Sequence, residues 1–217
     1  MKALAFDVYG TLVDVNALEP ALNGIVPRPR EFLAEWRSKQ LEYSFLLGLM
    51  GRYQTFSEVT SRALEFCCTK SPIVLGDRER GALLRGWQEL PAFPDAVPAL
   101  TALTGRLVLA TLTNMDPAGA REVLAHAGLA KFFQQQMSVD EVRTFKPDPA
   151  VYHHAAKRLR LEPKDVGLVS SNPFDVMGAK AAGLTAIWVH RSNVPLDPLD
   201  LAPDIEVKDL TGLPRLL

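Results

Sequence analysis

Short apolar runs alternate with polar, helix-like stretches along most of the chain. The runs are bounded by Gly, Asp, Asn or Ser, which is typical of strands buried on both faces. The clearest predict strands at Ala3–Phe6, Leu107–Leu112, Val166–Val169 and Thr185–Val189, and a weaker run predicts a fifth at Gln136–Val139. Because strands separated by helices form parallel sheets covered on both faces, this order predicts an α/β fold.

Helical patterns fill the segments between these runs. The predicted helices of this part are Pro117–Ala127 with Asp116 as its N-cap, Pro149–Leu159, and Phe174–Ala182 with Gly183 as its C-cap. The segment from residue 16 to residue 89 contains no convincing strand, and its pattern predicts helices at Glu31–Met50, Phe56–Cys68 and Arg78–Trp87. We therefore expect a core of residues 1–15 and 90–217, with a helical cap of residues 16–89 inserted after the first strand. Such a cap is expected over the carboxyl edge of the sheet, where α/β proteins bind ligands.

Composition and charge exclude several classes of partner. The chain has 217 residues, 24 Lys and Arg against 25 Asp and Glu, and a net charge of −1. Without a basic run, it has no electrostatic footprint for nucleic acid or an anionic membrane. No stretch approaches the ~20 apolar residues that span a bilayer. The expected ligand is a small molecule.

Cysteine usage and the start of the chain indicate a compartment. The two cysteines, Cys67 and Cys68, are adjacent, and each lacks a second partner for a disulfide. This usage is typical of a reducing environment. The acid Asp7 also interrupts the first apolar run too early for a secretion signal. We expect a cytoplasmic protein.

Polar side chains terminate the predicted strands. Asp7 ends the first, Thr113 and Asn114 end the second, and Ser170 ends the third, with Asp175 shortly after it. Because parallel strands end at one edge, these groups and Lys146 are expected to converge on one crevice. A nucleophile, a charge partner and orienting groups are what covalent catalysis requires. The alternative is that strand ends are commonly polar and Asp7 only caps the following turn.

The residues around Asp7 resemble the first motif of the haloacid dehalogenase superfamily, an apolar strand, an Asp nucleophile and a Gly-Thr pair. In this chain Asp7-Val8-Tyr9-Gly10-Thr11 is similar to the form found in the L-2-haloacid dehalogenase branch. The superfamily's phosphatases have a second Asp at the position of Tyr9 and hold Mg²⁺. The resemblance implies a Rossmann-like parallel sheet with a helical cap, no cofactor, and a homodimer.

Four further segments match this branch in order. They are Trp36–Tyr43 in the cap, Thr113-Asn114, Lys146–Tyr152, and Ser170-Ser171-Asn172-Pro173-Phe174-Asp175. The chain departs from the branch at Thr113, where Ser is usual, and at Phe174, where Trp is common. The first of these changes keeps the hydroxyl and adds a methyl group, which restricts rotation of the side chain.

The resemblance implies a role for each matching residue in converting L-2-haloalkanoic acids to D-2-hydroxy acids. Asp7 attacks C2 and forms an ester, Arg37 and Asn114 bind the leaving halide, and Lys146 supports Asp7 and the substrate carboxylate. Asp175 and Asn172 position the water that cleaves the ester. The orienting residues are Thr11, Thr113, Ser170 and Tyr152. The remaining pocket residues are Tyr9, Leu41, Phe56 and Phe174, and ordinary core packing is an equal alternative for the last three.

Two features support this chemistry without the resemblance. Mg²⁺ takes several oxygen ligands, but the crevice offers only the carboxylates Asp7 and Asp175, which argues for metal-independent displacement rather than phosphoryl transfer. Arg37 shares an apolar helix face with Leu41 and Phe45, so an anion is expected beside it. The alternative for Arg37 is a salt bridge to Glu35 or Glu42. A phosphatase of the same superfamily and a catalytically idle ligand binder are the alternative functions.

Overall fold

A parallel sheet forms the centre of the computed structural model, which describes residues 1–191 and 195–217. In this described part, six strands follow the order β3-β2-β1-β4-β5-β6, and every neighbouring pair is parallel. The strands are β1 (Ala3–Phe6), β2 (Val108–Thr113), β3 (Gln135–Ser138), β4 (Val166–Ser170), β5 (Thr185–Val189) and β6 (Ile205–Val207). This arrangement confirms the predicted α/β class and its Rossmann-like topology.

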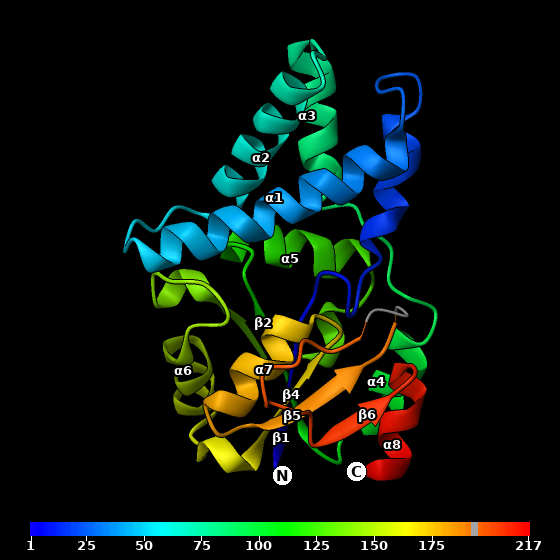
Figure 1. Ribbon diagram of the computed structural model, residues 1–217. Coiled ribbons are helices and arrows are strands. Elements are labelled where there is room, and N and C mark those ends of the chain that lie inside the picture. Colours follow the sequence, from blue (N-terminus) through cyan, green and yellow to red (C-terminus); the bar gives the residue numbers. More distant parts are fainter. Residues whose placement is uncertain (192–194) are drawn as a thin grey trace.

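Helices cover the sheet and extend beyond one of its edges (Figure 1). The α-helices are α1 (Pro29–Leu49), α2 (Phe56–Lys70), α3 (Asp77–Gly86), α4 (Ala96–Leu103), α5 (Pro117–His126), α6 (Pro149–Leu159), α7 (Pro173–Ala181) and α8 (Leu213–Leu216). The 3-10 helices are η1 (Val15–Leu22), η2 (Ala130–Phe132), η3 (Val139–Glu141), η4 (Pro163–Asp165) and η5 (Leu210–Gly212). Helix α5 packs against β3, and α7 packs against β4 and β5.

Local signals in the sequence explain where several elements begin and end. Strand β1 is entirely buried, as its unbroken apolar run predicts. Asp116 caps α5 by accepting a hydrogen bond from the Gly119 amide at 3.1 Å. Gly183 follows α7 with φ of 83°, a left-handed conformation that glycine adopts without strain. The predicted strands β2 and β3 are each displaced by one residue from their observed positions.

The helical cap consists of η1, α1, α2 and α3, which stand together at the end of the molecule opposite the two termini (Figure 1). Helix α1 packs along α2 and η1, and α3 packs against η1. At the centre of the cap, the rings of Trp36 and Trp87 meet edge to face with centroids 5.4 Å apart. The Trp36 indole also donates to the Thr60 carbonyl oxygen at 2.9 Å, which ties α1 to α2. The exact limits of the cap, residues 16–89, stay a prediction.

Polar and aromatic contacts join the cap to the sheet core. The Tyr53 hydroxyl donates to Asp140 Oδ1 at 2.9 Å. The Ser57 hydroxyl donates to Asp116, so the carboxylate that caps α5 also holds the start of α2. These contacts hold the cap over the carboxyl edge of the sheet.

The remaining expectations concern the cysteines and the C-terminal part. Cys67 and Cys68 are buried thiols without a disulfide. The Pro-, Leu- and Asp-rich composition of residues 195–203 predicts a segment that wraps the surface, and these residues form no regular element and are mostly exposed. Within the described ranges, none of the helices combines the length and the apolar character needed to cross a membrane.

Candidate active site

The carboxyl edge of the sheet brings the predicted polar residues together. Asp7 follows β1 directly, Thr113 ends β2, and Ser170 ends β4. Because β1 pairs with both β2 and β4, these three ends are neighbours in the sheet. Asn172 and Asp175 enter from the loop after β4 and from the first turn of α7. The topology therefore collects side chains that lie far apart in sequence.

Three donors hold the Asp7 carboxylate in one orientation. Its Oδ2 accepts hydrogen bonds from the Thr11 hydroxyl and from Asn172 Nδ2, both at 2.8 Å. Its Oδ1 accepts one from Lys146 Nζ at 3.0 Å. Asp7 is 6% exposed, so little water competes for these contacts. Oδ1, with one donor against two at Oδ2, is the oxygen with more lone-pair density free for reaction.

The Lys146 ammonium bridges two buried carboxylates. It lies 3.0 Å from Asp7 Oδ1 and 2.8 Å from Asp175 Oδ2, and its side chain is 1% exposed. Burial lowers the pKa of Lys146, but the attraction of Asp175 and Asp7 outweighs this effect and raises that pKa above its usual value. Lys146 is therefore charged at neutral pH and offsets the two carboxylates.

Asp175 lies behind Asp7 and is completely buried. Burial raises the pKa of Asp175, Asp7 adds to this effect, and Lys146 opposes it. Asp175 Oδ1 accepts a hydrogen bond from the Tyr152 hydroxyl at 2.9 Å. Burial, together with the nearby Asp175 charge, raises the pKa of Tyr152 well above its usual value, so this hydroxyl stays a neutral donor. The Ser170 hydroxyl also interacts with Asp175 and accepts from the Asn172 amide at 3.1 Å.

A second set of contacts fixes the loop after β1. The Thr11 hydroxyl that donates to Asp7 accepts from the Ser171 amide at 2.9 Å, and Ser171 Oγ donates to the Gly10 carbonyl oxygen at 2.6 Å. Gly10 has φ of 85°, which favours glycine at this turn. Arg191 reaches the Thr11 carbonyl oxygen with two nitrogens, at 2.7 and 3.0 Å. Ser171 and Arg191 are positioning residues that sequence reasoning did not single out.

A small cavity lies between these groups and the cap. Its volume is about 10 Å³, roughly room for one water molecule. The lining residues are Asp7, Tyr9, Arg37, Phe56, Thr113, Asn114, Lys146, Asn172 and Phe174. Predicted nucleophile, halide-binding and apolar pocket residues therefore meet at one place. Leu41, also predicted for the pocket, is half-buried and does not line this cavity.

Arg37 extends from α1 of the cap toward Asp7. Burial lowers the pKa of Arg37, and the nearby Asp7 and Tyr9 partly oppose that effect. The salt-bridge alternative is wrong for both proposed partners, because Glu35 pairs with Lys70 and Glu42 pairs with Lys39. A guanidinium in the cavity wall, without these partners, is suited to bind an anion.

A relay of hydrogen bonds orients the Arg37 guanidinium. Arg37 Nη1 donates to Gln40 Oε1 at 3.3 Å, and Gln40 Nε2 donates to the Thr60 hydroxyl at 2.9 Å. That hydroxyl donates in turn to the Phe56 carbonyl oxygen at 2.7 Å. Gln40 is fully buried, so its amide has no alternative partner in water. Sequence reasoning missed Gln40, although its position three residues after Arg37 places both on neighbouring parts of one helix face.

Two other lining residues present polar hydrogens to the cavity. The Tyr9 hydroxyl is buried and has no hydrogen-bond partner among the described residues. Burial raises the pKa of Tyr9 strongly, so it stays protonated. Asn114 Oδ1 accepts from the Lys146 amide at 3.1 Å, which leaves its side-chain nitrogen as a donor. Thr113 Oγ1 accepts from the Met115 amide at 3.2 Å and supports the turn after β2.

The two carboxylates do not fit a divalent cation. A Mg²⁺ ion would need several oxygen ligands at about 2.1 Å. The Lys146 ammonium pairs with both Asp7 and Asp175, and no third acid, His or Cys joins them among the described residues. The two carboxylates are therefore arranged to accept hydrogen bonds from ammonium and amide groups rather than to bind a metal ion.

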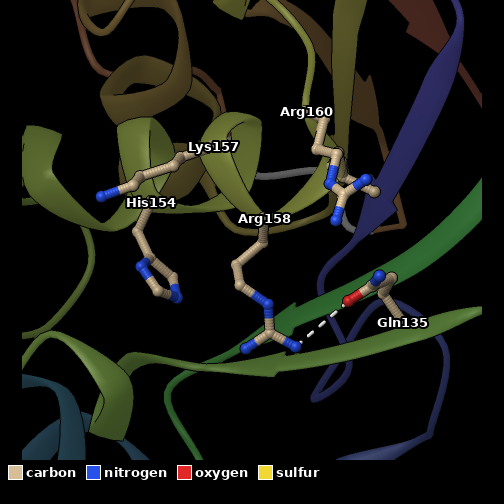
Figure 2. A pocket seen from close by; sticks show the side chains of 6 residues that line it. Gln135, His154, Lys157, Arg158 and Arg160 are labelled. Carbon is tan, nitrogen blue, oxygen red and sulfur yellow. Dashed lines mark hydrogen bonds between the residues drawn. The ribbon is translucent and has the colours of Figure 1, made fainter.

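A larger hollow lies elsewhere on the surface and lacks this chemistry. It has a volume of about 620 Å³ and is lined by Gln135, His154, Lys157, Arg158, Leu159 and Arg160. In Figure 2, Arg158 reaches Gln135, whereas Lys157 points away from Arg160. It lies at the start of β3 and the end of α6, on the opposite edge of the sheet from Asp7. Its cations do not converge on one point, so the small cavity at Asp7 is the candidate site.

Comparison with known proteins gives the family. The family of haloacid dehalogenase-like hydrolases matches residues 1–183. The (S)-2-haloacid dehalogenase of Pseudomonas sp. (strain YL) is 38% identical over 218 residues, covering 100% of this chain and 94% of that protein. The haloacetate dehalogenase H-2 of Moraxella sp. (strain B) is 35% identical, with 100% and 98% covered. An L-2-haloacid dehalogenase from Xanthobacter autotrophicus, solved with chloropropionic acid covalently bound, gives a TM-score of 0.93 at 34% identity, with 100% and 98% covered.

The sheet order, the inserted cap and this match define an enzyme of the hydrolase class, and the chain belongs to the haloacid dehalogenase-like hydrolases. Within that family, similarity over the full length places it in the branch of the L-2-haloacid dehalogenases. The resemblance seen in the sequence motifs is thereby confirmed.

Proposed function

We propose that the protein hydrolyses the carbon–halogen bond of L-2-haloalkanoic acids to give D-2-hydroxy acids, without a metal ion. The observation that carries this proposal is the Asp7 carboxylate, fixed by three donors at the wall of a cavity that also contains Arg37. Full-length similarity to (S)-2-haloacid dehalogenases supports hydrolysis of a carbon–halide bond as the reaction.

In the first step, Asp7 Oδ1 forms a bond to C2 of the substrate while the carbon–halogen bond breaks. The bonding electron pair leaves with the halide, and C2 is inverted. Arg37 and the Asn114 side-chain nitrogen bind the departing halide, and the Tyr9 hydroxyl adds a third donor. Preorganised donors that face developing negative charge lower the barrier because they need no reorientation during the reaction.

In the second step, water attacks the carbonyl carbon of the Asp7 ester. The bond between this carbon and Oδ1 then breaks, and Oδ1 takes up a proton and leaves as the hydroxyl group of the 2-hydroxy acid. The oxygen of the attacking water completes the restored Asp7 carboxylate. Asn172 and Asp175 orient the water, and Asp175 accepts its proton. Tyr152 and Ser170 hold Asp175, Thr11 holds Asp7, and Thr113 supports the turn that carries Asn114. Lys146 balances charge throughout and attracts the substrate carboxylate.

The apolar wall supports recognition of the alkyl group. Phe56 and Phe174 line the cavity from the cap and from α7. Leu41 would reach the substrate only after a rearrangement of the closed cavity, because it does not line that cavity in this structure.

The test is halide release from L- and D-2-chloropropionate in the presence of EDTA. We expect the wild type to release chloride from the L-isomer only and Asp7→Asn to release none. Lys180→Met, which alters an exposed ion pair, is the control for a nonspecific effect. Release that requires Mg²⁺, or turnover of phosphate esters instead, would replace this proposal with the phosphatase alternative. Ligand binding without any turnover would indicate an idle binder.

The cytoplasmic location and the homodimer also stay predictions. Two buried, unpaired thiols support a reducing compartment. Light scattering of the purified chain measures the oligomeric state directly.

A further inference from the structure

The closed cavity has no space for the alkyl part of a substrate, but an apolar groove adjoins it. The cavity beside Asp7 has a volume of about 10 Å³, whereas the groove measures about 460 Å³. The groove runs between the second half of α1 and the loop before α6, and its walls include Phe45, Gly48, Phe145 and Pro149. Lys146 and Phe174 line both spaces, so the groove lies directly beside the candidate active site.

The Phe174 side chain separates the two spaces. It is half-buried, and its ring meets the Phe45 ring edge to face with centroids 5.2 Å apart. Phe174 is the second residue of α7, at the rim of the site rather than in the core of the sheet. A change of its side-chain rotamer would open the cavity toward the groove without moving Asp7 or Lys146.

Polar and apolar surfaces around the site are segregated. Arg37, Asn114 and Asn172 line the cavity, and these donors suit the halide and the carboxylate of a haloacid. The groove walls are mainly aromatic rings, proline rings and the Lys146 stem, and these surfaces suit an aliphatic chain. When the reactive carbon of a substrate lies at Asp7, its alkyl tail can therefore extend toward the apolar groove.

We propose that this groove, defined by the residues around Gly48 and Phe145, binds the alkyl tail of longer 2-haloalkanoic acids. The inference rests on the proposed function and extends it from short haloacids to substrates with chains of about six carbons. A chloropropionate methyl group is too short to pass Phe174, whereas the tail of 2-chlorohexanoate passes it into the groove.

Gly48 offers a way to fill the groove without altering the catalytic groups. A Cβ atom at Gly48 would lie 3.6 Å from Thr144 Oγ1 and 4.0 Å from Phe145 Cδ2, which is ordinary contact. A leucine there fits at its Cβ and occupies the groove with the rest of its side chain. Gly81→Leu is the matched control, since Gly81 lies in α3 of the cap and its nearest neighbour is the flexible end of Arg85.

The experiment compares kcat/KM for L-2-chlorohexanoate and L-2-chloropropionate in the wild type and the two variants. One buried methylene contributes about fourfold to binding, so three extra methylenes contribute at most ~60-fold. We expect Gly48→Leu to lower the ratio of the two kcat/KM values by about tenfold or more, and Gly81→Leu to leave it unchanged. An unchanged ratio in Gly48→Leu would overturn the proposal.

Two further measurements separate this proposal from the proposed function and from another occupant. Calorimetric binding of hexanoate, which carries no halogen, should weaken in Gly48→Leu even if the wild type releases no chloride. Equal hexanoate affinity in all three proteins would count against the groove. Leu49 also lines the groove and is 88% exposed, so a second copy of the chain is the competing occupant. A change of oligomeric state in Gly48→Leu would assign the groove to a subunit contact instead.

Discussion

Removing the Lys146 ammonium should destabilise the protein strongly and in a pH-dependent way. In Lys146→Met, the Asp7 and Asp175 carboxylates lose a partner at 3.0 and 2.8 Å while their side chains are 9% and 0% exposed. Breaking a buried ion pair by removing one member costs about 3–5 kcal/mol. For a chain of this size, that corresponds to a fall in Tm of roughly 6–20 °C.

The sign of the pH dependence follows from Asp175. Burial and Asp7 already raise the pKa of Asp175 while Lys146 opposes them, so the variant should raise it further. A carboxyl group whose pKa is higher in the folded state destabilises that state progressively as the pH rises from the unfolded pKa through the folded one. The loss of unfolding free energy in Lys146→Met should therefore be smaller at pH 5 than at pH 8.

Urea unfolding of the wild type and Lys146→Met at both pH values measures this loss. Lys180→Met is the matched control, because Lys180 pairs with Asp204 where both side chains are over one-third exposed. That variant should lose no more than about 1 kcal/mol. The reasoning would be refuted by equal losses in the two variants at pH 8, or by a loss in Lys146→Met that grows toward pH 5.

Three further predictions concern particular hydrogen bonds. Gln40→Leu removes the acceptor that orients Arg37 and should lower kcat for L-2-chloropropionate by roughly tenfold or more, because Arg37 then no longer faces the charge that develops on the halide. Steady-state kinetics with chloride as a product inhibitor checks this, and an unchanged kcat contradicts it. Tyr152→Phe removes a donor to Asp175 and should lower kcat by roughly 10- to 100-fold. The Asp7 ester should then accumulate and be detected by mass spectrometry, and an unchanged kcat contradicts this prediction. Asp116→Ala removes the α5 cap and the contact to Ser57, and should lower the unfolding free energy in urea by about 1–2 kcal/mol. If only the α5 cap contributes to stability, Ser57→Ala should leave the unfolding free energy unchanged. A lower unfolding free energy in Ser57→Ala would show that the contact to α2 contributes as well.

The accuracy of the sequence predictions depended on how each element is buried. Strands β1 and β5 were predicted with their observed limits, because a strand buried on both faces is an unbroken apolar run. Strand β6 was missed because it is short and lies at the sheet edge, where Glu206 is exposed. Helix α4 was also missed, since the segment directly before it, with Pro91 and Pro94, breaks the helical pattern.

By itself, the sequence determined the α/β class, the inserted cap and the polar residues that end the strands. These features follow from local periodicity and from the rule that parallel strands share one carboxyl edge. Only the tertiary structure decided that Lys146 lies between two carboxylates, that Gln40 orients Arg37, and that Phe174 separates a closed cavity from an apolar groove. Lys146 and Asp7 are 139 residues apart, so their 3.0 Å contact depends on the register of the sheet and the packing of the loop before α6. Local patterns do not encode such distances, because they result from the simultaneous packing of segments that meet only in the folded chain.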